Sequence, residues 1–109
     1  MWKKGRQNSA YFKCTIFKSK ILKADFYLLK FPLGSEIKAH LDEVNNAFEH
    51  HRLNIIIKKA KSGGEFICNN KKRKGRIQYF RPDTMLHSVT KIEEGCRYVL
   101  SIGWLKKKK

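Results

Sequence analysis

The chain has 109 residues, and its 25 lysines and arginines against 9 aspartates and glutamates give a formal net charge of +16. This length allows one domain with a modest hydrophobic core and excludes a second. There is no apolar run of about 18 residues to span a membrane and no signal-peptide pattern at the start, so we expect a cytoplasmic protein. Three cysteines without Cys-x-x-Cys spacing predict neither a zinc site nor a disulfide framework.

The excess of positive charge favours an acidic macromolecular partner such as DNA or RNA, because basic surfaces attract polyanions. Much of the charge lies in three runs, at residues 3–6, 71–76 and 106–109. Runs of this kind are equally often solvated tails. Composition alone leaves both interpretations open.

Seven segments are predicted to be β-strands, because they are short, rich in Ile, Val, Phe and Tyr, and separated by turn signals such as Ser62-Gly63-Gly64. In chain order they are Tyr11 to Ser19, Asp25 to Phe31, Leu53 to Lys58, Glu65 to Cys68, Arg76 to Phe80, Leu86 to Ile92 and Arg97 to Trp104. Many short strands at this spacing predict a β-sandwich, jelly roll or barrel. We therefore expect one all-β domain over residues 1–109, with its core at about 11–104 and a basic C-terminal tail at 105–109.

One segment has a different period. Four apolar residues recur at helical spacing, namely Ile37, Leu41, Val44 and Phe48. Ser35 is suited to cap such a helix, so periodicity alone predicts a helix from Glu36 to Glu49. In a helix, His40 and Asp42 would lie about 200° apart and could not bind one metal ion together.

Several short motifs follow one another in a specific order. They are Phe31-Pro32-Leu33-Gly34, His40-x-Asp42, Gly63-Gly64-Glu65, His87 followed by Val89, and Gly95-Cys96-Arg97-Tyr98. Each motif is weak by itself, but together, over about residues 25–104, they resemble the iron(II)- and 2-oxoglutarate-dependent dioxygenases, especially the prolyl-hydroxylase-like branch. The chain looks like a near-minimal version of that family.

The resemblance implies a fold and a metal site. The fold is a double-stranded β-helix, which is a jelly-roll or cupin-like barrel, with little or no flanking helix. His40, Asp42 and His87 would bind Fe(II), because two histidines and one carboxylate leave three positions open for a keto acid and dioxygen. His40 and Asp42 would then point the same way from a strand, and His87 would come from a neighbouring strand.

The resemblance also implies a site for 2-oxoglutarate. Arg97 would hold the distal carboxylate of this co-substrate with two charge-assisted hydrogen bonds. Tyr27 and Asn54 are further candidates to contact it. Many relatives have Tyr where this chain has Phe31, so a hydroxyl near the co-substrate is missing or comes from Tyr27.

Other residues have simpler interpretations. Gly63-Gly64 is interpreted as a structural turn, since glycine adopts unusual backbone dihedrals there. His50 and His51 are adjacent, and adjacent residues of a strand point to opposite faces, so both are expected at the surface and outside the metal site. Barrel faces left uncovered in a minimal chain predict a homo-oligomer.

The implied activity is hydroxylation of a carbon–hydrogen bond with Fe(II), 2-oxoglutarate and O2. Its substrate is unidentified and is expected to be a macromolecule. The net charge favours nucleic acid, whereas "GGEF" and "GCRYVLSIGW" look more like the protein-hydroxylase branch. The alternatives are a small basic nucleic-acid-binding module without catalysis, with Trp2 or Tyr11 exposed for stacking, and a degenerate oxygenase fold with a structural role.

Overall fold

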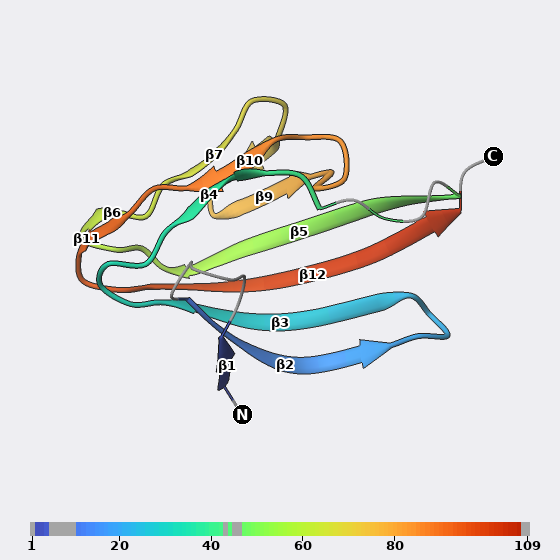
Figure 1. Ribbon diagram of the computed structural model, residues 1–109, viewed down its shortest axis with the longest axis horizontal. Helices are drawn as coiled ribbons and strands as arrows, with labels where there is room; N and C mark the ends of the chain where they lie inside the picture. The colour runs from blue at the N-terminus through green and yellow to red at the C-terminus, as the bar shows by residue number, and fades with distance from the viewer. Residues whose placement is uncertain (1, 5–10, 43, 45–46, 108–109) are drawn as a thin grey trace.

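The computed structural model describes residues 2–4, 11–42, 44 and 47–107. Within these residues all regular structure is β-strand, as expected (Figure 1). The strands are β1 Trp2–Lys4, β2 Phe12–Ser19, β3 Ala24–Phe31, β4 Ile37–His40, β5 Phe48–Lys58, β6 Ser62–Gly63, β7 Phe66–Cys68, β8 Lys72–Lys74, β9 Ile77–Phe80, β10 His87–Val89, β11 Ile92–Glu94 and β12 Arg97–Lys107. No helix among the described residues is long and apolar enough to cross a membrane.

The strands form one large sheet and two small ones. The large sheet has seven strands in the order β1-β2-β3-β12-β5-β9-β8, a second sheet has the order β4-β10-β7, and β11 pairs with β6. In Figure 1 the three-stranded sheet lies alongside β9 and β5. Strands from distant parts of the sequence therefore become neighbours. Their side chains lie on the two walls of one barrel.

Alternation along β12 shows which face of the large sheet points into the barrel. Arg97, Val99, Ser101 and Gly103 are buried, whereas the residues between them are half-buried. Because successive side chains of a strand point to opposite faces, the buried set defines the inner face. The core between the sheets is small, and its fully or mostly buried members are Tyr11, Phe31, Val89, Ile92 and Val99.

The helix predicted from Glu36 to Glu49 is wrong for the described residues. Ile37–His40 is strand β4, and β5 already begins at Phe48. β4 pairs with β10, with His40 opposite His87. These long-range backbone hydrogen bonds override the local apolar period. Residues 43, 45 and 46 of the predicted helix lie outside the described residues.

Several predicted strand boundaries need correction. β5 begins at Phe48 instead of Leu53, and the predicted strand from Leu86 to Ile92 is divided into β10 and β11. β12 continues to Lys107, so the first part of the predicted basic tail is strand that pairs with β5. Residues 108 and 109 of that tail lie outside the described residues.

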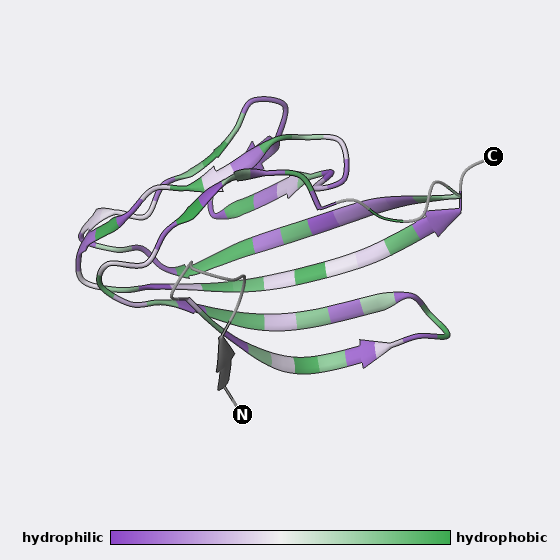
Figure 2. Ribbon diagram, in the orientation of Figure 1, coloured by the Kyte–Doolittle hydropathy of each residue, from purple (hydrophilic) through white to green (hydrophobic). Residues whose placement is uncertain are grey.

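The outer face of the large sheet is strongly apolar. Two cross-strand rows on this face are Phe26, Ile102 and Leu53, and Leu28, Leu100 and Ile55. Hydrophobic residues recur along β2, β3, β12 and β5 in Figure 2. The homo-oligomer therefore stays a prediction with a defined surface, since a large apolar patch on a sheet face is typical of a protein–protein contact. Light scattering after size exclusion is expected to give more than the 12.8 kDa of one chain, and a monomer mass would contradict it.

Gly63 is a position where only glycine fits. Its φ is +77°, and a Cβ there would overlap the carbonyl oxygen of Lys91. We expect Gly63→Ala to lower the free energy of unfolding by about 2 to 5 kcal/mol, from backbone strain plus overpacking. Gly75→Ala is the control, because Gly75 also has positive φ but has open space around it, and should cost about 1 kcal/mol. Equal losses in chemical denaturation would contradict the steric explanation.

Candidate metal and co-substrate site

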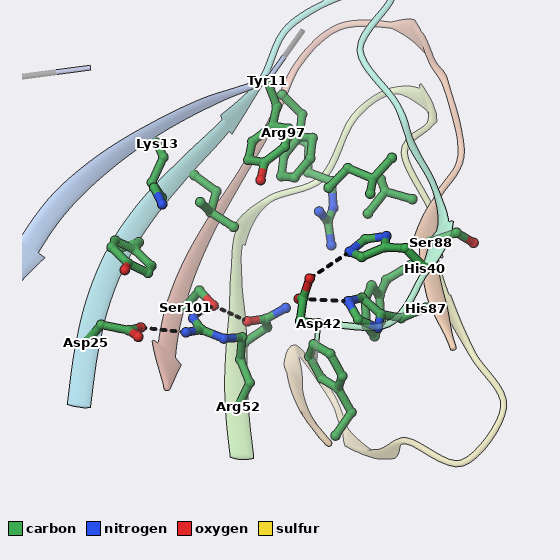
Figure 3. Close-up of a pocket in the computed structure, with 18 of the residues that line it drawn as sticks. Tyr11, Lys13, Asp25, His40, Asp42, Arg52, His87, Ser88, Arg97 and Ser101 are labelled. Carbon is green, nitrogen blue, oxygen red and sulfur yellow. Dashed lines mark hydrogen bonds and ion pairs between the residues drawn. The ribbon is translucent and has the colours of Figure 1, made fainter. Parts of the chain in front are cut away.

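A cavity of about 310 Å³ lies between the large sheet and the three-stranded sheet. This volume is at the lower end of the range for small-molecule sites. The six residues predicted for the site all line it, and they are Tyr27, His40, Asp42, Asn54, His87 and Arg97 (Figure 3). The fold thus brings together residues that are up to seventy positions apart in the sequence.

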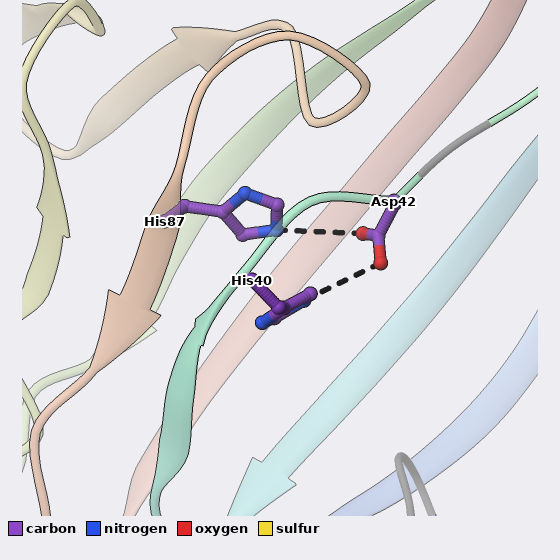
Figure 4. Close-up of side chains that lie close together, drawn as sticks. All are labelled: His40, Asp42 and His87. Carbon is purple, nitrogen blue, oxygen red and sulfur yellow. Dashed lines mark ion pairs between the residues drawn. The ribbon is translucent and has the colours of Figure 1, made fainter.

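His40, Asp42 and His87 form a compact group at one wall of the cavity. His40 ends β4 and lies opposite His87 on β10, and Asp42 follows two residues after His40. The Nε2 atoms of His40 and His87 lie 3.3 and 3.4 Å from the two carboxylate oxygens of Asp42 (Figure 4). One ligand atom from each residue lies within 4.8 Å of the others.

The other ring nitrogen of each histidine faces a backbone carbonyl. Nδ1 of His40 lies 2.7 Å from the oxygen of Lys38, and Nδ1 of His87 lies 2.8 Å from the oxygen of Met85. A carbonyl oxygen can only accept, so each Nδ1 donates its hydrogen, and a neutral ring then has its lone pair on Nε2. This second hydrogen bond is what orients histidine ligands in metal proteins. The donor set therefore fits a first-row divalent metal such as Fe(II).

Arg97 is buried in the same cavity without an anionic partner. Arg97 is 3% exposed. Its guanidinium lies 5.0 Å from the ring centroid of Phe31, and its Nη2 has no hydrogen-bond partner. No carboxylate of the described residues lies within ion-pairing distance of it. Burial lowers the pKa of Arg97 to about 10, so the group is still charged at neutral pH. A buried unpaired charge is costly, which makes this position complementary to an anion.

Tyr27 and Asn54 lie on either side of Ser101 across β3, β12 and β5. Ser101 Oγ donates to Asn54 Oδ1 at 2.6 Å, so that oxygen already has a partner inside the protein. Lys13 Nζ lies 4.4 Å from the centroid of the Tyr27 ring. Burial, and then the charge of Asp25, raise the pKa of Tyr27, which keeps its hydroxyl protonated. Tyr27 therefore offers a hydrogen-bond donor that Phe31 lacks.

An ion pair beside these residues was not predicted from the sequence. Arg52 Nη2 lies 2.5 Å from Asp25 Oδ1, and Arg52 Nη1 donates to Ser101 Oγ. The Arg52 side chain crosses over Gly103, where a Cβ would overlap the guanidinium. A glycine inside an apolar strand often marks such a close approach, so Gly103 was the available signal.

His50 and His51 point to opposite faces of the large sheet, as predicted, but the prediction that both are surface residues is wrong. His50 is half-buried and lines the cavity, and its Nδ1 is buried without a hydrogen-bond partner. Burial, and then the charge of Arg52, lower its pKa. His51 is half-buried on the other face, where its ring stacks against those of Tyr79 and Trp104. Neither belongs to the three-residue group around Asp42.

Comparison with known proteins identifies the fold. No protein-family model and no curated protein matches the sequence. Among solved structures, KdgF from Halomonas sp. aligns with a TM-score of 0.63 and 14% identity, over 99% of this chain and 88% of that one. A cupin 2 conserved barrel domain protein from Rhodopseudomonas palustris aligns with a TM-score of 0.60 and 12% identity, over 100% and 72%. The chain has the cupin-like double-stranded β-helix fold.

A third similar structure is a viral collagen prolyl hydroxylase from Paramecium Bursaria Chlorella virus-1, solved with 2-oxoglutarate. It aligns with a TM-score of 0.58 and 18% identity, over 78% of this chain, which spans 59% of that one. The similar structures thus include cupins and an oxygenase that binds 2-oxoglutarate. At these identities they show the predicted double-stranded β-helix and do not distinguish the branches within it.

Proposed function

We propose that this protein is an Fe(II)- and 2-oxoglutarate-dependent oxygenase that hydroxylates a carbon–hydrogen bond. The observation that carries the proposal is the pairing of two features in one cavity. One is the His40, Asp42 and His87 group, with both Nε2 atoms directed at the same carboxylate. The other is the buried Arg97 guanidinium with an unpaired Nη2. The three-residue group is complementary to a metal ion, and the Arg97 guanidinium is complementary to a carboxylate of a diacid.

In this proposal His40, Asp42 and His87 would hold the iron. The hydrogen bonds from the two histidine Nδ1 atoms to the backbone oxygens of Lys38 and Met85 keep both imidazoles in place. When bound, iron and 2-oxoglutarate supply the oxidation, in which dioxygen is consumed, succinate and carbon dioxide are released, and a carbon–hydrogen bond becomes a hydroxyl. The Asp42 carboxylate would neutralise part of the charge of the bound metal. Three coordination positions are left for exchangeable ligands.

Arg97 would bind the distal carboxylate of 2-oxoglutarate. Its planar guanidinium can donate two parallel hydrogen bonds, which fixes the orientation of the diacid as well as its position. Phe31 lies beside Arg97 and cannot donate, so we assign the additional hydroxyl to Tyr27. Asn54 would contribute its amide nitrogen, because its oxygen already accepts from Ser101.

A macromolecular substrate, either a protein side chain or a nucleic acid, is the substrate class we propose. The exposed residues of β8, Lys72 to Lys74, lie at the edge of the large sheet and would attract a polyanion. The rival, a basic nucleic-acid-binding module without catalysis, would use the Lys and Arg clusters on phosphates and an exposed Trp2 or Tyr11 for stacking. Tyr11 is 9% exposed and stacks on Phe31, and the side chain of Trp2 lies outside the described residues. This burial favours the oxygenase over the rival.

The proposal is tested by succinate formation in the absence of any target. Purified protein with Fe(II), 2-oxoglutarate, ascorbate and air is expected to release succinate and carbon dioxide in equal amounts at a slow, uncoupled rate. Omitting iron is expected to stop it. If no succinate forms, and if DNA binding is the same in the natural chain and in His87→Ala, the non-catalytic binding module is the better description.

A further inference from the structure

A second, larger cavity adjoins the first and shares Arg97 with it. Its volume is about 600 Å³, and it lies beside the Ser62–Gly63 strand and the segment before it. Arg97 and Phe66 line both cavities, so the two cavities are neighbours. Nothing in the proposed oxygenase reaction uses this second cavity.

Gln78 points to a ligand in this cavity. It lies on β9 between Asn54 of β5 and Arg73 of β8, it is 3% exposed, and it lines the cavity. Its Oε1 is buried and has no hydrogen-bond partner. A buried amide oxygen left without a donor costs roughly 1 to 3 kcal/mol, so an apolar side chain would be more stable here unless a ligand supplies that donor.

The charge around the cavity is strongly positive. Lys59, Lys61, Arg73 and Arg97 line it, and Glu65 is the single acidic lining residue. Lys61 is paired with Glu94 at 3.3 Å. Among the described residues, no carboxylate lies within ion-pairing distance of Lys59 or Arg73. Two exposed cations, Lys59 and Arg73, and the unpaired amide oxygen of Gln78 therefore line a cavity that Arg97 also lines.

We propose that the second cavity binds a small phosphate-type anion, either free phosphate or the phosphate group of a small molecule. Lys59 and Arg73 supply opposite charge, the Gln78 amide nitrogen donates to a phosphate oxygen, and Gln78 Oε1 accepts from the hydroxyl of a singly protonated phosphate. Because Arg97 faces both cavities, the anion shares its charge with the ligand of the first cavity. If the proposed function holds, phosphate and 2-oxoglutarate weaken each other's binding, since two anions would draw on one guanidinium.

The anion site is tested without iron or 2-oxoglutarate, so that its outcome is independent of the oxygenase proposal. Inorganic phosphate is titrated into the metal-free full chain at constant ionic strength, with chloride as the balancing anion, and binding is followed by phosphorus NMR line width. We expect saturable binding that Gln78→Leu and Arg73→Ala each weaken roughly tenfold. Lys20→Ala, which removes an exposed charge away from the cavity, should leave it unchanged.

Three results would overturn the anion site. They are binding that does not saturate, equal weakening by Lys20→Ala, and full affinity in Gln78→Leu. Gln78→Leu removes a buried unpaired group, so it is expected to fold, and its thermal melting shows whether it does. A short single-stranded DNA, titrated in parallel, separates the sources of phosphate. If Gln78→Leu weakens DNA and phosphate binding equally, the site recognises a polymer and the small-anion proposal fails.

The coupling between the cavities has its own experiment. In the presence of Mn(II) as a redox-stable substitute for iron, the affinity for 2-oxoglutarate is measured by calorimetry with and without saturating phosphate. A several-fold loss that disappears in Gln78→Leu supports the shared guanidinium. An unchanged affinity, with phosphate binding already shown, overturns the coupling and leaves the anion site intact.

Discussion

Replacing His87 with alanine is expected to weaken iron(II) binding by roughly a hundredfold or more, because a direct ligand contributes at least as much as the outer groups that orient it. His87 Nε2 and His40 Nε2 both face Asp42, so the loss of either imidazole leaves two donors where a stable site needs three. Anaerobic titration with Fe(II) in the presence of 2-oxoglutarate measures this through the visible absorption of the chelated keto acid. His40→Ala should behave in the same way.

His51→Ala is the matched control for this experiment. His51 is on β5 of the large sheet, on its outer face, and stacks on Tyr79 and Trp104 away from the cavity. Its loss should lower stability but leave the visible absorption intact once the protein is folded. If His87→Ala is folded by circular dichroism and still binds iron with full affinity, the proposed ligand set is incorrect.

Replacing Arg97 with methionine is expected to separate co-substrate binding from metal binding. Two charge-assisted hydrogen bonds to a carboxylate would be lost, which corresponds to roughly a hundredfold weaker binding of 2-oxoglutarate. Iron binding alone should be unchanged, because Arg97 offers no metal ligand. The metal-free protein should become more stable by about 1 kcal/mol, since a buried guanidinium without an anion is replaced by an apolar side chain of similar length.

Calorimetry with 2-oxoglutarate and thermal unfolding without ligands test both parts of this prediction. Arg76→Met is the control, because it removes the same charge from an exposed position outside both cavities. It should leave the affinity for 2-oxoglutarate within about twofold, as expected for a distant surface charge. Equal loss of iron and 2-oxoglutarate binding in Arg97→Met would mean that Arg97 only supports the fold.

The sequence predicted the fold class and six of the residues that line the cavity, but it misjudged the segment before Asp42. Ile37 and Leu41 belong to an apolar period typical of a helix, yet β4 pairs with β10 far along the chain. Leu41 is 41% exposed, so it is not part of an apolar helix face. A local apolar period carries no information about a strand partner far along the chain. The order of the motifs reflects the whole barrel, and it indicated a strand at this position.

The sequence also missed the polar half of β5. The predicted strand began at Leu53, because Glu49, His50, His51 and Arg52 are polar. In the structure His50 and Arg52 face the cavity, and His51 pairs with Glu49 on the other face at 3.0 Å. A strand that lines a polar cavity loses the alternation of apolar and polar residues on which strand prediction depends.

The two groups that define the site belong to different sheets. His40 and His87 lie on the three-stranded sheet, and Arg97 lies on the seven-stranded sheet. A diacid that chelates the metal at one end and meets the guanidinium at the other would therefore tie the two layers of the barrel together, much as a cross-link does. Such a molecule would limit the separation of the layers, and full loading would protect this small core from heat and proteases more than either ligand alone.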